Sequence, residues 1–170
     1  MGARGGRPQP LTSGPVPHSR PAWSHDGQWI YASGGGGIRK IAAGGGTIVQ
    51  LTHNGGTNAA ESADGKTVYY TNNGAVWRVG TDGSGERQAI DGPASPLTMC
   101  PRADGIYYVT PGPNRSIQFF SFATGQSRVI HKLDKPPSLG LSVSPDGAWL
   151  LYTQMDRQAT ADLLLVDPFR

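Results

Sequence analysis

An Asp-Gly dipeptide recurs at a nearly constant interval along the chain, and this repeat constrains the fold more than any other feature. It occurs at Asp26-Gly27, Asp64-Gly65, Asp104-Gly105 and Asp146-Gly147, with steps of 38, 40 and 42 residues. Each copy leads into a run rich in aromatic and β-branched residues: QWIYAS, KTVYYT, IYYVT and AWLLYT. Asp-Gly before an extended run is typical of a β-hairpin turn, because both residues tolerate positive φ. The spacing therefore predicts a repeating unit that begins with a hairpin.

Two further apolar segments follow each hairpin. The third segments lie at 38–42, 76–80, 117–122 and 163–167, and the fourth at 47–52, 87–91 and 128–133. Four short strands in a unit of this length are the pattern of a β-propeller blade. Consecutive apolar residues such as Val68-Tyr69-Tyr70 fit a sheet that is packed on both faces. We expect an all-β β-propeller of about four blades of four antiparallel strands, with repeats at 21–52, 57–91, 96–133 and 139–170.

Two of the copies carry a family resemblance. PAWSHDGQWIYAS at 21–33 and LSVSPDGAWLLYT at 141–153 resemble the TolB-type, WD-like repeat, whose core is Trp/Val-Ser-Pro-Asp-Gly followed by a strand. QLT at 50–52 is similar to the usual ending of the fourth strand, whereas the second and third copies, ESADG and CPRADG, depart from the pattern. The resemblance covers about residues 10–170. It implies a propeller in a bacterial envelope or signalling protein, and it does not identify a partner.

The two ends of the repeat allow either a closed or a partial ring. Residues 1–9 are expected to form a flexible tail, and PLT at 10–12 resembles QLT, which predicts a stray fourth strand there. This strand could complete the last blade and close a four-bladed ring. Alternatively, the chain is the C-terminal part of a larger bacterial propeller protein, of which some have an N-terminal winged-helix domain. We expect the second, a partial ring, whose open blade edges would favour self-association.

The composition argues against several kinds of partner. Arg4, Arg7 and Arg20 lie in the first twenty residues, and residues 21–170 carry 12 Lys and Arg against 12 Asp and Glu. This balance argues against nucleic-acid contact. The single Cys100 excludes a disulfide framework or a zinc cluster. No apolar run reaches the ~18 residues of a membrane span, and there is no secretory signal, so neither periplasm nor cytoplasm is favoured.

No motif predicts catalysis or a cofactor. ADGKT at 63–67 lacks the earlier glycine of a phosphate loop, because position 60 is Ala60. The four histidines have no metal-ligand spacing, and no Gly-x-Ser-x-Gly sequence is present. We therefore expect no catalytic residue, no metal site and no cofactor in this segment, and a protein that is not an enzyme.

The loops between the second and third strands of each unit are the candidate binding site. In a propeller they share a face with the links between blades, and PGPNR at 111–115 and QMDRQATAD at 154–162 are longer and more polar than a tight turn requires. The candidate protein-binding residues are Asn114, Arg115, Asp156 and Arg157. The predicted function is a non-catalytic scaffold for protein–protein interaction or sensing. Two alternatives stay open: the propeller part of a prolyl-oligopeptidase-like peptidase, and a propeller that binds a small molecule.

Overall fold

The computed structural model describes residues 8–95, 98–156 and 161–166, which form four antiparallel sheets. The first contains β1 (Ser19–Trp23), β2 (Trp29–Gly34), β3 (Gly37–Ala42) and β4 (Ile48–Gln50). The second contains β5 (Thr57–Glu61), β6 (Thr67–Asn72), β7 (Ala75–Gly80) and β8 (Arg87–Ile90). The third contains β9 (Met99–Pro101), β10 (Gly105–Thr110), β11 (Ser116–Ser121) and β12 (Ser127–Lys132). The fourth contains β13 (Pro137–Val143), β14 (Leu150–Met155) and β15 (Ala161–Val166).

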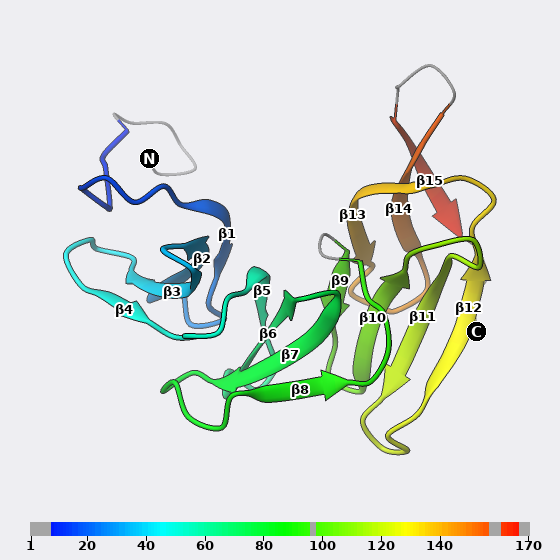
Figure 1. Cartoon of the computed structure of the whole chain (residues 1–170), viewed down its shortest axis with the longest axis horizontal. Helices are drawn as coiled ribbons and strands as arrows, with labels where there is room; N and C mark the ends of the chain where they lie inside the picture. The colour runs from blue at the N-terminus through cyan, green and yellow to red at the C-terminus, as the bar shows by residue number, and fades with distance from the viewer. Residues whose placement is uncertain (1–7, 96–97, 157–160, 167–170) are drawn as a thin grey trace.

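The sheets follow one another along an arc in chain order, so that the first and the fourth lie at its two ends (Figure 1). Neighbouring sheets touch through their first strands: β1 contacts β5, β5 contacts β9, and β9 contacts β13. Within each sheet the strands pair antiparallel in chain order. The predicted all-β propeller with four blade-like sheets is confirmed.

Each junction between two sheets is filled by buried side chains from both. At the first junction, Tyr31 and Ile38 pack with Val68 and Tyr70. Similar clusters fill the junctions between the second and third sheets and between the third and fourth sheets. Successive side chains of a strand point to opposite faces. Tyr69 and Tyr70 therefore face different neighbouring sheets, which explains why these strands are apolar at consecutive positions.

Three of the four Asp-Gly turns are closed by the same serine–aspartate contacts. In the first sheet the hydroxyl of Ser24 donates to Asp26 Oδ1 at 2.6 Å, and the backbone N–H of Trp29 donates to Ser24 Oγ at 2.9 Å. The same two contacts recur at Ser62 with Asp64 and at Ser144 with Asp146. The hydroxyl bond is the main cause that lowers the pKa of all three aspartates.

The third Asp-Gly pair has a different structural role, although the sequence places it in the same repeat. Arg102 stands where the other turns have serine, and its backbone N–H donates to the carbonyl of Gly105 at 2.8 Å, which shortens the turn. Gly105 is therefore the first residue of β10, whereas Gly27 in the first turn has a φ of 69°. A Cβ on Gly105 would lie 2.1 Å from the carbonyl oxygen of Phe120. Close packing, and not turn conformation, requires glycine there.

Residues 10–12 do not form the stray fourth strand that the sequence predicts. Leu11 packs instead against Ile30, Ala32 and Ile41, on the face of the first sheet opposite to the second sheet. Residues 8–17 include four prolines, which have no N–H to donate to a strand pair. The segment therefore covers the sheet with a side chain and does not extend it. Of the predicted tail at 1–9, residues 1–7 lie outside the described residues.

Candidate binding surface of the third and fourth sheets

Asn114 and Arg115 lie in the loop between β10 and β11, beyond the last strand pair of Thr110 with Ser116. The Nε–H of Arg115 donates to the carbonyl oxygen of Gly112 at 3.0 Å, which holds this end of the loop in place. Asn114 is exposed and Arg115 is partly buried. Both side chains line a pocket of about 440 Å³ on the outer part of the third sheet.

Asp156 directly follows β14 and is tied to the link between the third and fourth sheets. Its Oδ1 lies 3.2 Å from Lys135 Nζ. Both side chains are about two-fifths exposed, so the ion pair stabilises the fold by about 0–1 kcal/mol at most. The two residues line a second pocket, of about 570 Å³, together with Met155. The ion pair is therefore part of the pocket lining and adds little to the stability of the fold.

The structure brings three of the four predicted binding residues to one edge of the molecule. Asp134, in the link between the third and fourth sheets, lines both pockets. Asn114 and Arg115 therefore lie on one side of this link, and Asp156 lies on the other. Arg157 is outside the described residues. The role of these residues in binding stays a prediction.

The outer face of the fourth sheet is an exposed apolar surface that the sequence analysis missed. It consists of Leu151 in β14, its partner Leu165 in β15, and Leu163 on the same side of β15. These side chains are 37%, 54% and 70% exposed, in that order. We call these three residues the open face. Trp149, directly before β14, and Met155, the last residue of β14, are also exposed.

The strand register shows that the other sheets bury the position of Leu163. The equivalent residues of the first three sheets, each opposite the same position of the second strand, are Ile38, Val76 and Ile117. All three are 0% exposed, because the next sheet packs on them. Leu163 occupies the same place and is 70% exposed. The apolar third segments of the repeat contain this signal, but they do not show which copy lacks a neighbour.

A buried carboxylate joins the first and second sheets. Glu61 accepts the hydroxyl of Tyr31 at 2.7 Å and the backbone N–H of His25 at 2.6 Å. Burial, together with this carboxylate, raises the pKa of the Tyr31 hydroxyl, which stays protonated. The carboxylate is thus used to hold two sheets together.

Cys100 lies in β9 and is partly buried, and burial raises the pKa of its thiol. A thiol of raised pKa is a weak nucleophile at neutral pH, so Cys100 is a packing residue.

In the described part of the chain, no group of three or more His, Cys, Asp and Glu side chains could hold a metal. The same residues include no helix long and apolar enough to cross a membrane.

Comparison with known proteins defines the fold class and its neighbours. No family model matches the chain, and no curated protein sequence matches it. Many solved structures do match, and the fold of the chain is similar to that of TolB-like β-propellers. TolB from Acinetobacter baumannii has a TM-score of 0.76 and 16% identity, over 98% of this chain and 45% of that chain.

Two other neighbours have different names and the same fold. An oligogalacturonate lyase from Vibrio parahaemolyticus has a TM-score of 0.70 and 14% identity, over 92% of this chain and 53% of that chain. A chain of the nidogen/laminin complex has a TM-score of 0.67 and 14% identity, over 88% of this chain and 64% of that chain. The chain therefore spans about half to two thirds of these proteins. At such identities the similarity establishes the propeller fold and no activity.

Proposed function

We propose that the chain is a non-catalytic β-propeller scaffold for protein–protein interaction, and that its open face binds a second copy of the chain. The observation that carries this proposal is the position of Leu163. It is 70% exposed, whereas Ile38, Val76 and Ile117 at the equivalent positions are fully buried by a neighbouring sheet. A sheet face of this composition is suited to packing against another sheet.

A second copy fits the open face because the face is uncharged. Leu151, Leu163 and Leu165 bring no like charges together when two copies meet. Two sheets packed face to face would interdigitate their leucines at about 10 Å, as in a β-sandwich. The polar side chains near the end of β14, including Asp156 and Lys135, would form a polar rim beside the apolar contact.

The first sheet supports a closed pair and not a longer assembly. Its outer face, with Ile30 and Ile41, is already covered by Leu11. In its described residues each copy therefore presents one open sheet face, and two such faces satisfy each other in a symmetric dimer. The TolB-type resemblance of the sequence supports a bacterial envelope or signalling setting for this scaffold.

Sedimentation velocity of the purified chain at increasing concentration tests the proposal. We expect a particle of twice the chain mass of 17.9 kDa, which dissociates on dilution. Leu163→Asp should weaken the dimer by roughly 100-fold or more, since it places two charges in an apolar contact. The matched control is Val49→Asp, because Val49 is a strand residue of the first sheet that is 43% exposed. A wild-type monomer at all concentrations, or equal loss in both variants, would contradict the proposal.

The reading frame on both sides of the gene tests the remaining part of the proposal. A Gly-x-Ser-x-Gly sequence in an adjoining hydrolase domain would overturn the non-catalytic role, because the propeller would then belong to a peptidase. Further blades in frame would support the C-terminal part of a larger TolB-type protein. They would then cover the open face in place of a second copy, and the dimer would be wrong.

A further inference from the structure

Two arginines face each other across the outer strands of the second sheet. Arg78 of β7 pairs directly with Arg87 of β8. A β-bulge between Val76 and Trp77 shifts the register by one residue and so creates this pair. Like charges directly opposite each other on a sheet are destabilising. The repulsion between the two guanidinium groups would be offset by a negative charge placed between them.

At the equivalent positions, the first and third sheets each have one cationic side chain, and each of these has a partner. In the first sheet Lys40 lies opposite Val49, and its Nζ donates to the carbonyl oxygen of Thr81 at 2.9 Å. In the third sheet Arg128 lies opposite Phe119, and its guanidinium lies 5.5 Å from the centre of that ring. Among the described strands, two cationic side chains face each other at these positions only in the second sheet.

The neighbouring carboxylates are already used elsewhere. Asp64 accepts from the hydroxyl of Ser62, and Asp82 accepts from the hydroxyl and the N–H of Ser84. Glu86, the residue before Arg87, accepts the hydroxyl of Tyr70 at 2.7 Å. Among the described residues, no carboxylate oxygen lies within 4.0 Å of either guanidinium group. The two guanidinium groups therefore have no ion-pair partner among the described residues, although Asp64 and Asp82 line the same pocket.

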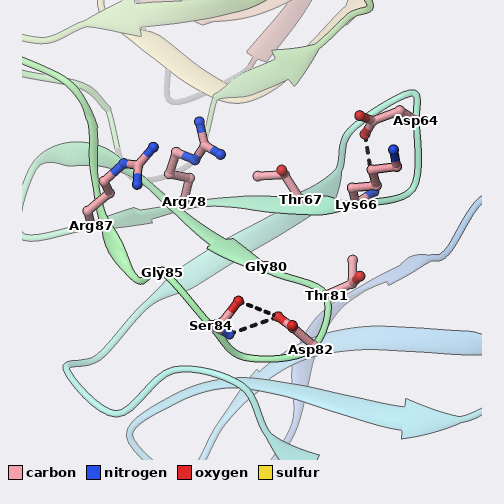
Figure 2. A pocket seen from close by; sticks show the side chains of 10 residues that line it. All are labelled: Asp64, Lys66, Thr67, Arg78, Gly80, Thr81, Asp82, Ser84, Gly85 and Arg87. Atoms are coloured by element: carbon pink, nitrogen blue, oxygen red, sulfur yellow. Dashed lines mark hydrogen bonds between the residues drawn. The ribbon is translucent and has the colours of Figure 1, made fainter.

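A pocket of about 540 Å³ lies beside the pair. Figure 2 shows the guanidinium groups of Arg78 and Arg87 projecting in the same direction, next to each other. Lys66 and Thr67 line the same pocket and add an ammonium and a hydroxyl donor. Arg78 also lines a neighbouring pocket of about 290 Å³ at the junction with the third sheet. The two guanidinium groups thus lie side by side at one end of the pocket, whereas Lys66 lies beside Asp64 (Figure 2).

We propose that this pocket binds a dianionic oxyanion of the phosphate type, held between the guanidinium groups of Arg78 and Arg87. The planar guanidinium fork matches the oxygens of a phosphate group, and each arginine can donate two parallel N–H bonds. The bound anion would remove the repulsion within the pair. The site is independent of the open face of the fourth sheet, and it differs from a phosphate loop, whose glycine the sequence lacks at Ala60.

Titration of the full chain with inorganic phosphate at constant ionic strength tests the proposal. The readouts are the NMR signals of the arginine Nε–H groups and the melting temperature. We expect saturable shifts at Arg78 and Arg87, and a melting temperature that rises with phosphate concentration. Arg78→Gln and Arg87→Gln should each weaken binding by roughly tenfold or more. In phosphate-free buffer either variant should melt at a higher temperature than the wild type, because the repulsion is removed.

Arg128→Gln is the matched control, since it removes an arginine from the equivalent outer strand of the third sheet, where Phe119 is the partner. It should leave phosphate binding unchanged. A second titration with O-phosphoserine distinguishes the source: tighter binding than inorganic phosphate indicates a phosphate ester, and equal or weaker binding indicates the free anion. The absence of saturation, or equal weakening in Arg128→Gln, would overturn the proposal.

Discussion

The first and fourth sheets both lie at an end of the arc, yet only one of them has a covered outer face. In the first sheet Ile30 and Ile41 are at most 9% exposed, and Leu11 packs on them. In the fourth sheet Leu163 and Leu165 are 70% and 54% exposed. The two faces are opposite sides of the repeat, because Ile30 and Ile41 match Leu150 and Val166 in register, and these pack toward the third sheet. The difference in exposure therefore reflects what lies against each end of the arc.

Each propeller sheet has two apolar faces, and the outer face at each end of the arc needs its own cover. Stacked repeats bury apolar faces only against a neighbour, and terminal units need a cap. The N-terminal segment supplies such a cap with little regular structure. At the other end the apolar positions are retained, as Leu151 shows, and no described residue covers them. An end that keeps apolar residues is suited to a partner, whereas a capped end is suited to solvent.

Truncating the same repeat position in a covered sheet and in an open sheet should give the greatest difference in stability. Ile38→Ala should lower the free energy of unfolding by about 2–5 kcal/mol, because it leaves a cavity at the first junction. Leu163→Ala should change it by less than about 0.5 kcal/mol, since the side chain is largely exposed. Urea unfolding at low protein concentration, where a dimer is dissociated, measures both. Similar losses in the two variants would mean that Leu163 is covered in solution even in the monomer.

A smaller effect should come from the cap of the first sheet. Leu11→Asp removes an apolar cover from Ile30 and Ile41 and places a carboxylate on them, which should cost about 1–2 kcal/mol. Leu165→Asp, at an exposed position of the fourth sheet, is the matched variant and should cost far less. The two urea midpoints, measured at low protein concentration where a dimer is dissociated, give the comparison. Equal midpoints would show that the segment at 10–12 does not stabilise the first sheet.

Hairpin chemistry made most of the fold predictable from the sequence. Serine, aspartate and glycine within each turn are local signals, and they placed the hairpins that open the first, second and fourth sheets. The third hairpin differs because Arg102 replaces serine and bonds to Gly105 across a shorter turn. That change depends on the pairing of β9 with β10, which a dipeptide count does not show. Leu11 was likewise misread as a strand residue, since its sequence neighbours resemble a strand ending.

The candidate binding residues were located with similar, partial success. Asn114 and Asp156 lie near one edge because loops between second and third strands share a face in this topology. The pair of Arg78 and Arg87 was not predictable, because a β-bulge sets its register. The exposure of Leu163 was not predictable either, since it depends on the neighbour of its sheet. Long-range pairing decides these features, and local sequence does not encode it.

A weaker effect should come from the Asp-Gly turn, which the two end sheets share. Asp26 and Asp146 each accept a serine hydroxyl, from Ser24 and Ser144, and this bond is the main cause of their lowered pKa. A lowered pKa means that the ionised aspartate stabilises the fold above the ordinary value of 3.8, and that this stability is lost as the pH falls through the lower folded value. Ser24→Ala and Ser144→Ala should each raise the pKa of their aspartate toward 3.8.

Carboxyl carbon NMR titration measures the two aspartates separately, and Ser33→Ala in β2, whose hydroxyl bonds to Thr57, is the control. The two shifts should agree, because the turns have the same contacts and both carboxylates are exposed to solvent. Equal pKa shifts would show that the two turns are alike, so that the first and fourth sheets differ in the covering of their outer faces. A shift at Asp146 that is much larger than at Asp26 would show that the open face also affects the turn beside it.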